Sequence, residues 1–230
     1  MLDMDYELVH QVVTNDNHLG APNGVDYEEQ LTANMMKQAA QDPQFQQKLE
    51  MLARQGVSFH VGDEVEKPGV SDGMTGNHYT FSVSSNQLEQ GGFSVVDETL
   101  EGIQRAKGND LKSFASSRTR YAAYTSTEDL RNDINTCKEI AALRGESVSE
   151  DVLKAEQKLQ ILDRYIETNP ALKNSSPERR EERGNFLLER LQQRPEIMEQ
   201  ITKEVQALTP NGGATEDTGP AVSNPAAPAM

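Results

Sequence analysis

The chain has no tryptophan, and aromatic residues of all kinds make up only 5% of its 230 residues. Hydrophobic residues account for 35%, and the mean hydropathy of -0.70 is low for a globular protein. A chain of this length can nevertheless bury a true core. We therefore expect one domain, alone or with appended helices, with two small units as the alternative. Its core should be modest, and much helix and loop should be exposed.

Cysteine is almost absent, because Cys137 is the single one in the chain. This excludes an internal disulfide and a cysteine-based metal site, and it fits a reducing compartment. The first residues, MLDMDYELVHQVV, lack the basic and apolar regions of a secretory signal, and no apolar run approaches the roughly 20 residues of a membrane span. The sequence thus predicts a cytoplasmic protein, although export by another route is not excluded.

Basic residues are scarce in the N-terminal half, where residues 1–104 contain 17 acidic and 4 basic residues. The whole chain has a net charge of -15. Such a field repels phosphate backbones, and no basic patch with interleaved aromatic residues offsets it. These features predict that neither nucleic acid nor a membrane is a partner.

Helix signals dominate, with one stretch of strand-like alternation between them. Asp26 and Asp42-Pro43 are helix start signals, and they predict helices over 27–41 and from 43 to about 55. Alternating apolar residues then predict strands at 57–61 and 78–83, separated by a glycine-rich loop over 62–77. A helix is expected from Phe93, followed by a loop over 109–117. The expected fold is α+β, mostly helical, with a small antiparallel sheet between residues 57 and 96.

The sequence of the C-terminal part predicts further helices. Thr125 and Glu128 have capping-box spacing and open a helix that should end at Arg144-Gly145. Three more helices are expected before residue 208, each with an apolar stripe at helical spacing. The predicted organisation is a loose arm over 1–25, an α+β domain over 26–145, a helical extension over 146–208 and a disordered tail over 209–230.

The stretch FSVVDETLEGIQ, residues 93–104, contains the most suggestive pattern in the chain. In a helix, Asp97, Glu101 and Gln104 fall at i, i+4 and i+7 on one face. A neighbouring stripe of Val96, Leu100 and Ile103 is apolar. One side of this helix can therefore be buried while its acidic side faces a groove.

This pattern resembles the H-E-x-x-H-A-x-Q helix of compact zincin-type zinc metallopeptidases. Glu98 stands at the position of the motif's catalytic glutamate, and Gln104 stands at the position of its glutamine. The resemblance implies a zincin-like domain over about residues 27–145, in which a second helix supplies a third metal ligand. Glu128 is the candidate for that ligand. Asp97 and Glu101, however, stand where the family has its histidines.

Three carboxylates, Asp97, Glu101 and Glu128, would favour Mg, Ca or Mn over zinc, and such ions lower the pKa of bound water much less. The resemblance therefore implies a degenerate domain that is not expected to be an enzyme and that binds a protein or peptide. Glu98 would be catalytic only in an active form. No cofactor is expected, with a divalent metal as the alternative.

A second interpretation of the same residues needs no metal. Glu101 and Arg105 have the i, i+4 spacing of an ion pair, Glu128 is half of a capping box, and Asp97 suits a helix N-terminus. The chain is then a helical interaction or structural protein, and its oligomeric state is open. The arginines at 179, 180, 183, 190 and 194 are interleaved with glutamates, as on a solvated or partner-facing helix.

Two further features are considered as candidate functional sites. His60 and His78 fall on the polar sides of the two predicted strands and could meet across a hairpin as a metal pair. Cys137 lies on an apolar stripe with Ile134 and Ala141, which is typical of an inert core thiol.

Overall fold

The computed structural model describes residue 12 and residues 27–62, 71–75, 78–84, 93–116, 124–172 and 174–208. The predicted arm, apart from Val12, and the predicted tail lie outside these ranges. Helices make up most of the described chain: α2 (Tyr27–Ala39), α3 (Pro43–Arg54), α5 (Phe93–Ser116), α6 (Thr127–Leu143), α7 (Glu150–Thr168), α8 (Pro177–Gln193) and α9 (Ile197–Leu208).

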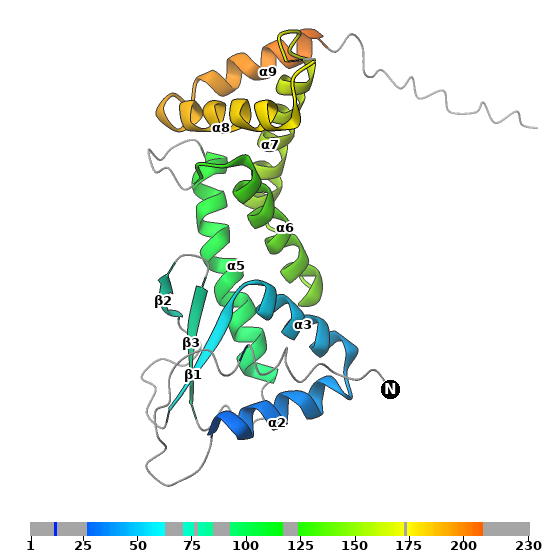
Figure 1. Ribbon diagram of the computed structural model, residues 1–230, viewed down its shortest axis with the longest axis vertical. Helices are drawn as coiled ribbons and strands as arrows, with labels where there is room; N and C mark the ends of the chain where they lie inside the picture. Colours follow the sequence, from blue (N-terminus) through cyan, green and yellow to red (C-terminus); the bar gives the residue numbers. More distant parts are fainter. Residues whose placement is uncertain are drawn as a thin grey trace, which may run out of the picture.

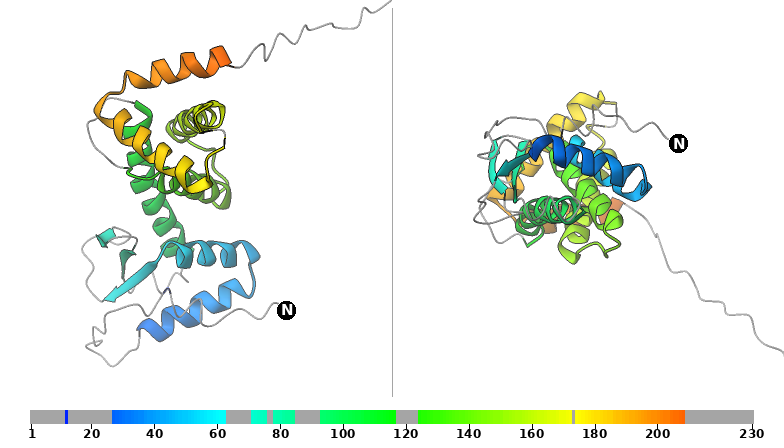
Figure 2. Two further views of the ribbon diagram at one scale, coloured as in Figure 1. Left: turned by 45° about the horizontal axis from the view of Figure 1, so that its top comes forward. Right: turned by 90° about the horizontal axis from the view of Figure 1, so that it is seen from below.

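The helices build an elongated body around α5 (Figure 1). Helices α2 and α3 lie with the strands at one end, and α5 runs from there toward the opposite end, where α8 and α9 cross α7 (Figures 1 and 2). Helix α5 packs against α3, α6 and α7. It is therefore the element that connects the two ends of the molecule.

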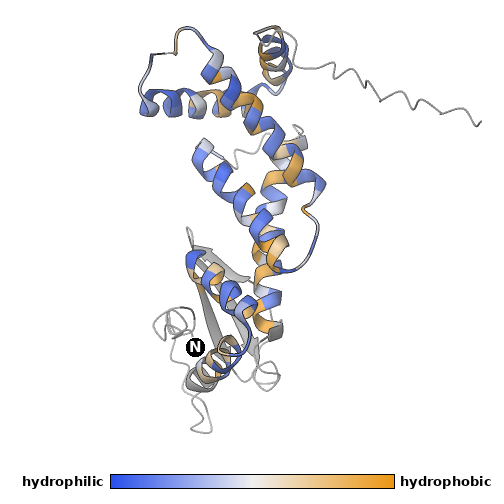
Figure 3. Ribbon diagram, turned by 90° about the vertical axis from the view of Figure 1, so that its right-hand side faces the viewer, coloured by the Kyte–Doolittle hydropathy of each residue, from blue (hydrophilic) through white to orange (hydrophobic). Residues whose placement is uncertain are grey.

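Two clusters of buried side chains form the core, and α5 contributes to both. Val95, Val96, Leu100 and Ile103 belong to the first cluster, together with residues of α2 and α3. Leu111 belongs to the second, which is built mainly from α6 to α9. Side chains from both sides of the predicted domain boundary at residue 145 share this second core. Hydrophobic and hydrophilic positions alternate along each helix, as Figure 3 shows.

The predicted α+β fold with a small antiparallel sheet is wrong. The body is helical, and the strands β1 (Val57–Gly62), β2 (Ser71–Thr75) and β3 (His78–Ser84) form a mixed arrangement in the order β1-β3-β2. β1 runs parallel to β3, and β2 runs antiparallel to it. The predicted loop over 62–77 contains β2, which forms the hairpin with β3 and leaves β1 to pair on the other side. Of the described core residues, Val57 alone comes from a strand.

Helix α5 is longer than predicted, and the expected loop over 109–117 is wrong. The helix continues to Ser116 because Leu111 is completely buried in the second core, where Phe114 and Ala115 pack against the same cluster. Gly108 lies inside this helix and weakens it by about 0.5–1 kcal/mol relative to alanine. Packing of the following turn outweighs that cost.

The helix termini follow local chemistry closely. Asp42 caps α3, where its side chain accepts a hydrogen bond from the Gln44 amide at 2.9 Å. Gly56 and Gly145 end α3 and α6 at φ 65° and 67°, a left-handed conformation that glycine adopts without strain. The cap of α6 is Ser126, one residue after the predicted Thr125. No helix in the described ranges is both long and apolar enough to cross a bilayer.

Candidate functional site

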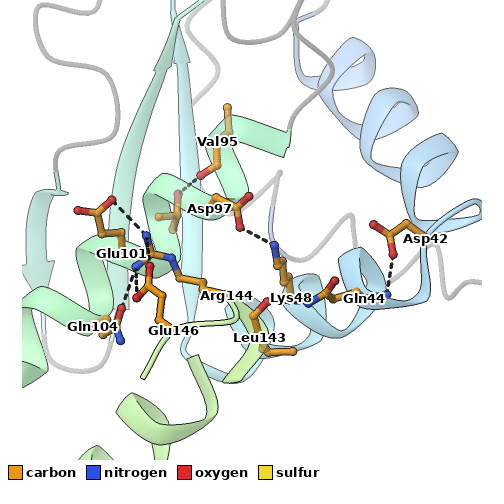
Figure 4. Close-up of polar contacts among 11 residues, drawn as sticks. Asp42, Gln44, Lys48, Val95, Asp97, Glu101, Gln104, Leu143, Arg144 and Glu146 are labelled. Carbon is orange, nitrogen blue, oxygen red and sulfur yellow. Dashed lines mark hydrogen bonds and ion pairs between the residues drawn. The ribbon is translucent and has the colours of Figure 1, made fainter. Parts of the chain in front are cut away.

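Asp97, in the second turn of α5, forms an ion pair with Lys48 of α3. The Lys48 Nζ lies 2.6 Å from the Asp97 Oδ1, and the Lys48 side chain is only 13% exposed (Figure 4). An ammonium group that loses most of its water is costly to bury unless a counter-charge lies close to it. Asp97 therefore joins α3 to the start of α5 as half of an ion pair.

Arg144, at the end of α6, contacts the next two residues of this row on α5, which are Glu101 and Gln104. Its Nη1 donates to the Gln104 Oε1 at 2.8 Å, and its Nη2 lies 3.4 Å from the Glu101 Oε2 and 3.0 Å from the Glu146 Oε1 (Figure 4). The Arg144 side chain is only 16% exposed. Arg105 makes a second ion pair with Glu101 from the next turn, as its i, i+4 spacing predicts.

The end of α6 explains how Arg144 comes to face α5. Arg144 is the C-cap of α6, and Gly145 reverses the chain so that the Glu146 amide donates to the Ala141 carbonyl at 2.8 Å. This turn directs Arg144 and Glu146 toward Glu101 and Gln104. Around them lies a cavity of about 390 Å³, also lined by Ser147 and Ser149 at the start of α7.

Glu128 does not lie near the other two predicted ligands. It stands in the first turn of α6, whereas Arg144 at the opposite end of the helix contacts Glu101. Sixteen residues separate Glu128 from Arg144, which places it about 24 Å along the helix from that contact. Glu128 instead borders a separate cavity with Arg131 and Asp163. The predicted trio of Asp97, Glu101 and Glu128 is therefore not brought together, and Glu98 is exposed.

The two histidines of the predicted metal pair, His60 and His78, are also not brought together. His60 pairs with Ser82 in the β1–β3 register, four residues from His78, so their backbones are about 13 Å apart along the strand direction. Among the described residues, no group of three or more histidine, cysteine, aspartate or glutamate side chains is placed to hold a metal ion.

The structure brings together a polar cluster that the sequence analysis missed. Lys107 of α5 pairs with the Asp133 Oδ1 of α6, and the Tyr124 hydroxyl donates to the Asp133 Oδ2 at 3.0 Å. Burial and the charge of Asp133 raise the pKa of Tyr124 above its ordinary value. These partners come from three separate segments, so no local spacing in the sequence could reveal them.

Cys137 lies beside this cluster. Burial, and then the charge of Asp133, raise its pKa to about 12. A thiol with such a pKa stays protonated at neutral pH and is a poor nucleophile or metal ligand. The predicted position of Cys137 in the core is confirmed, since Cys137 is 1% exposed within the second core.

The exposed side of α8 contains the second unusual arrangement. Phe186 is 41% exposed, and the guanidinium carbons of Arg183 and Arg190 lie 5.1 Å and 4.9 Å from the centre of its ring. Both distances are within the range of a cation–π interaction. Two arginines of the predicted run, Arg183 and Arg190, therefore gather around an exposed aromatic ring.

Comparisons with protein-family models, with curated proteins and with solved structures found no match to this chain. The resemblance of DETLEGIQ to the zincin helix therefore stays a prediction.

Proposed function

We propose that this chain is a helical interaction protein that acts by binding another protein, without catalysing a reaction. The observation that supports this is the position of Arg144. Its guanidinium lies beside Glu101 and Gln104, two positions of the motif that suggested a metal site.

The positive charge of Arg144 beside Glu101 and Gln104 disfavours the binding of a divalent cation in the same pocket. The Glu101 carboxylate already faces two guanidiniums, of Arg144 and Arg105, and Asp97 already faces the ammonium group of Lys48. A metal ion would have to displace these partners and then bear repulsion from the displaced charges. The acidic row of α5 serves instead to join α5 to α3 and α6.

Metal content and proteolysis test this proposal directly. Purified full-length protein, loaded with Zn²⁺ or Mn²⁺ and then dialysed, should retain far less than one ion per chain by elemental analysis. It should also leave unfolded casein intact. About one bound ion per chain, together with cleavage that is lost in Glu98→Gln, would refute the proposal.

A charge-removal variant sharpens the experiment. In Arg144→Gln the guanidinium is gone, while Glu101, Gln104 and Glu146 remain. If Arg144 merely masks a working metal site, this variant should gain Mn²⁺ binding in equilibrium dialysis. We expect no gain, because Glu128 lies about 24 Å away along α6 and completes no ligand set.

A further inference from the structure

The exposed side of α8 has its charges sorted into two edges. With about 100° of rotation per residue, Arg179, Arg183 and Arg190 fall roughly 20–60° to one side of Phe186. Glu178, Glu182 and Glu189 fall roughly 40–80° to the other side. An exposed phenyl ring therefore separates an arginine edge, defined as Arg179, Arg183 and Arg190, from a glutamate edge.

This sorting differs from that of an ordinary solvated helix. Two exposed ion pairs elsewhere in the protein, Glu101–Arg105 and Glu150–Lys154, join opposite charges one turn apart on the same helix. On α8, no acidic residue stands three or four positions from Arg183 or Arg190. Within the described chain, the guanidiniums of the arginine edge make no ion pair with a carboxylate of the same molecule.

Those unpaired charges are also held in position. Two of the three guanidiniums lie over the ring of Phe186, and this contact restricts both arginine side chains. Arginines ordered in this way lose less entropy when they bind a carboxylate in two-pronged fashion. Phe186 itself offers apolar area that a partner can cover.

We propose that this side of α8 binds an acidic helical segment of a partner protein, with the partner's carboxylates on the arginine edge and an apolar side chain over Phe186. The inference rests on the proposed binding function and names its site and the chemistry of its partner. The arginine edge spans about 17 Å from Arg179 to Arg190, which matches roughly three turns of a helix. Recognition of acidic motifs by clustered arginines is a known mode of peptide binding.

The charge pattern favours a peptide over a nucleic acid. A nucleic-acid strand bears a phosphate at every residue, so some of its phosphates would also meet the glutamate edge. A helical segment can place its acids on one edge alone and turn neutral or basic residues toward Glu182 and Glu189.

A synthetic peptide tests the proposal on the full-length protein. The probe is a fluorescein-labelled helix of about 14 residues, with three glutamates at the spacing of the arginine edge and two leucines beside them. Fluorescence anisotropy should show saturable binding that weakens as the salt concentration rises. Arg183→Glu/Arg190→Glu and Phe186→Ser should each weaken binding by at least about tenfold.

Two controls separate loss of the site from loss of the fold. Lys37→Glu/Lys112→Glu makes the same change in net charge on α2 and α5 and should leave binding within about twofold of the unmodified protein. A peptide with lysines in place of its glutamates should bind Arg183→Glu/Arg190→Glu more tightly than it binds the unmodified protein. Lys37→Glu/Lys112→Glu has the same net charge and should not show this exchange of preference, so an exchange confined to the α8 variant assigns it to the arginine edge.

Several results would overturn the proposal. One is the absence of saturable binding up to about 1 mM peptide; another is binding that the α8 variants leave unchanged. Equal competition by inorganic pyrophosphate or by a DNA oligonucleotide would indicate a general anion site. Self-association that Phe186→Ser abolishes would assign the surface to a second copy of the chain. Each of these outcomes leaves the metal and casein experiments unaffected, so the two proposals can fail separately.

Discussion

Lys107 on α5 and Asp133 on α6 form an ion pair inside the helical body, with side chains only 15% and 18% exposed. The second oxygen of Asp133 accepts a hydrogen bond from the Tyr124 hydroxyl, with 3.0 Å between the two oxygens. This small network joins α5, α6 and the segment that precedes α6. Because it is largely shielded from water, each of its members should affect stability much more than a surface charge.

Replacement of Lys107 with methionine should lower the free energy of unfolding by about 3 kcal/mol, because Asp133 would remain largely buried with its main counter-charge removed. Urea titration at neutral pH measures this change. Lys112→Met is the matched control on the same helix, since Lys112 is exposed; it should stay within about 0.5 kcal/mol of the unmodified protein. Equal effects of the two substitutions would contradict the role given to the pair.

Tyr124→Phe should cost about 1.5 kcal/mol at neutral pH, because Asp133 loses a hydrogen-bond donor. The ordinary phenol pKa is 10.0, and the pKa of Tyr124 is raised by burial and by Asp133. The stabilisation from Tyr124 is thus fully present below pH 10 and is lost at higher pH, where the unfolded chain ionises and the folded one does not. Urea titrations from pH 7 to pH 11 should show a gap between the two proteins that narrows above pH 10. A constant gap would argue against a raised pKa.

Cys137 should be almost unreactive in the folded protein. With its pKa at about 12, roughly one thiol in 10⁴ is ionised at pH 8, whereas an exposed cysteine in an unfolded chain is about one quarter ionised. Labelling with a disulfide reagent should therefore be slower than in concentrated urea by at least about 10³-fold. Fast labelling under native conditions would mean that the α5–α6 contact opens readily.

Replacement of two glycines, Gly184 and Gly108, with alanine should change the free energy of unfolding in opposite directions. In Gly184→Ala on α8, the new methyl would lie 3.2 Å from the Thr127 Cγ2 and 3.3 Å from the Ile166 Cδ1. Thr127 cannot shift easily, because its amide and hydroxyl both donate to the Asn185 Oδ1, at 2.8 Å and 3.2 Å. Overpacking of about 2 kcal/mol should outweigh the gain in helix propensity, for a net loss of about 1 kcal/mol.

Gly108→Ala on α5 is the counterpart, because a methyl group there would meet nothing within 4 Å. It should raise the free energy of unfolding by about 0.5–1 kcal/mol through helix propensity alone. Thermal unfolding of both variants gives the comparison. The packing account would be wrong if the two substitutions moved stability in the same direction.

Local signals were sufficient for most helix boundaries. Asp42-Pro43, Ser176-Pro177 and the glycines at 56 and 145 act through their own backbone geometry and nearest amides, so their effects can be predicted without knowledge of distant residues. The extension of α5 past Gly108 had no such signal. It depends on Leu111, which is buried only because α6 and α7 come to lie against it.

The structure does not bring Asp97, Glu101 and Glu128 together, for a related reason. Spacing along one helix correctly placed Glu101 beside Arg105 on α5. Whether Glu128 also approached them depended on the direction of α6, and helical periodicity carries no information about direction. Helix α6 places its C-terminal Arg144 against Glu101, and Glu128 lies at its far end.

By itself, the sequence determined where most helices start and stop, which of their faces are apolar, and that Cys137 lies on such an apolar face, because these properties depend on neighbours within a few residues. The tertiary structure decided which helices pack together and in which direction. It thereby decided that β1 pairs parallel with β3, that Arg144 pairs with Glu101 of α5, and that Asp133 contacts both Lys107 and Tyr124. These contacts join segments far apart in the chain, and their energies depend on burial that exists only once the whole body has packed.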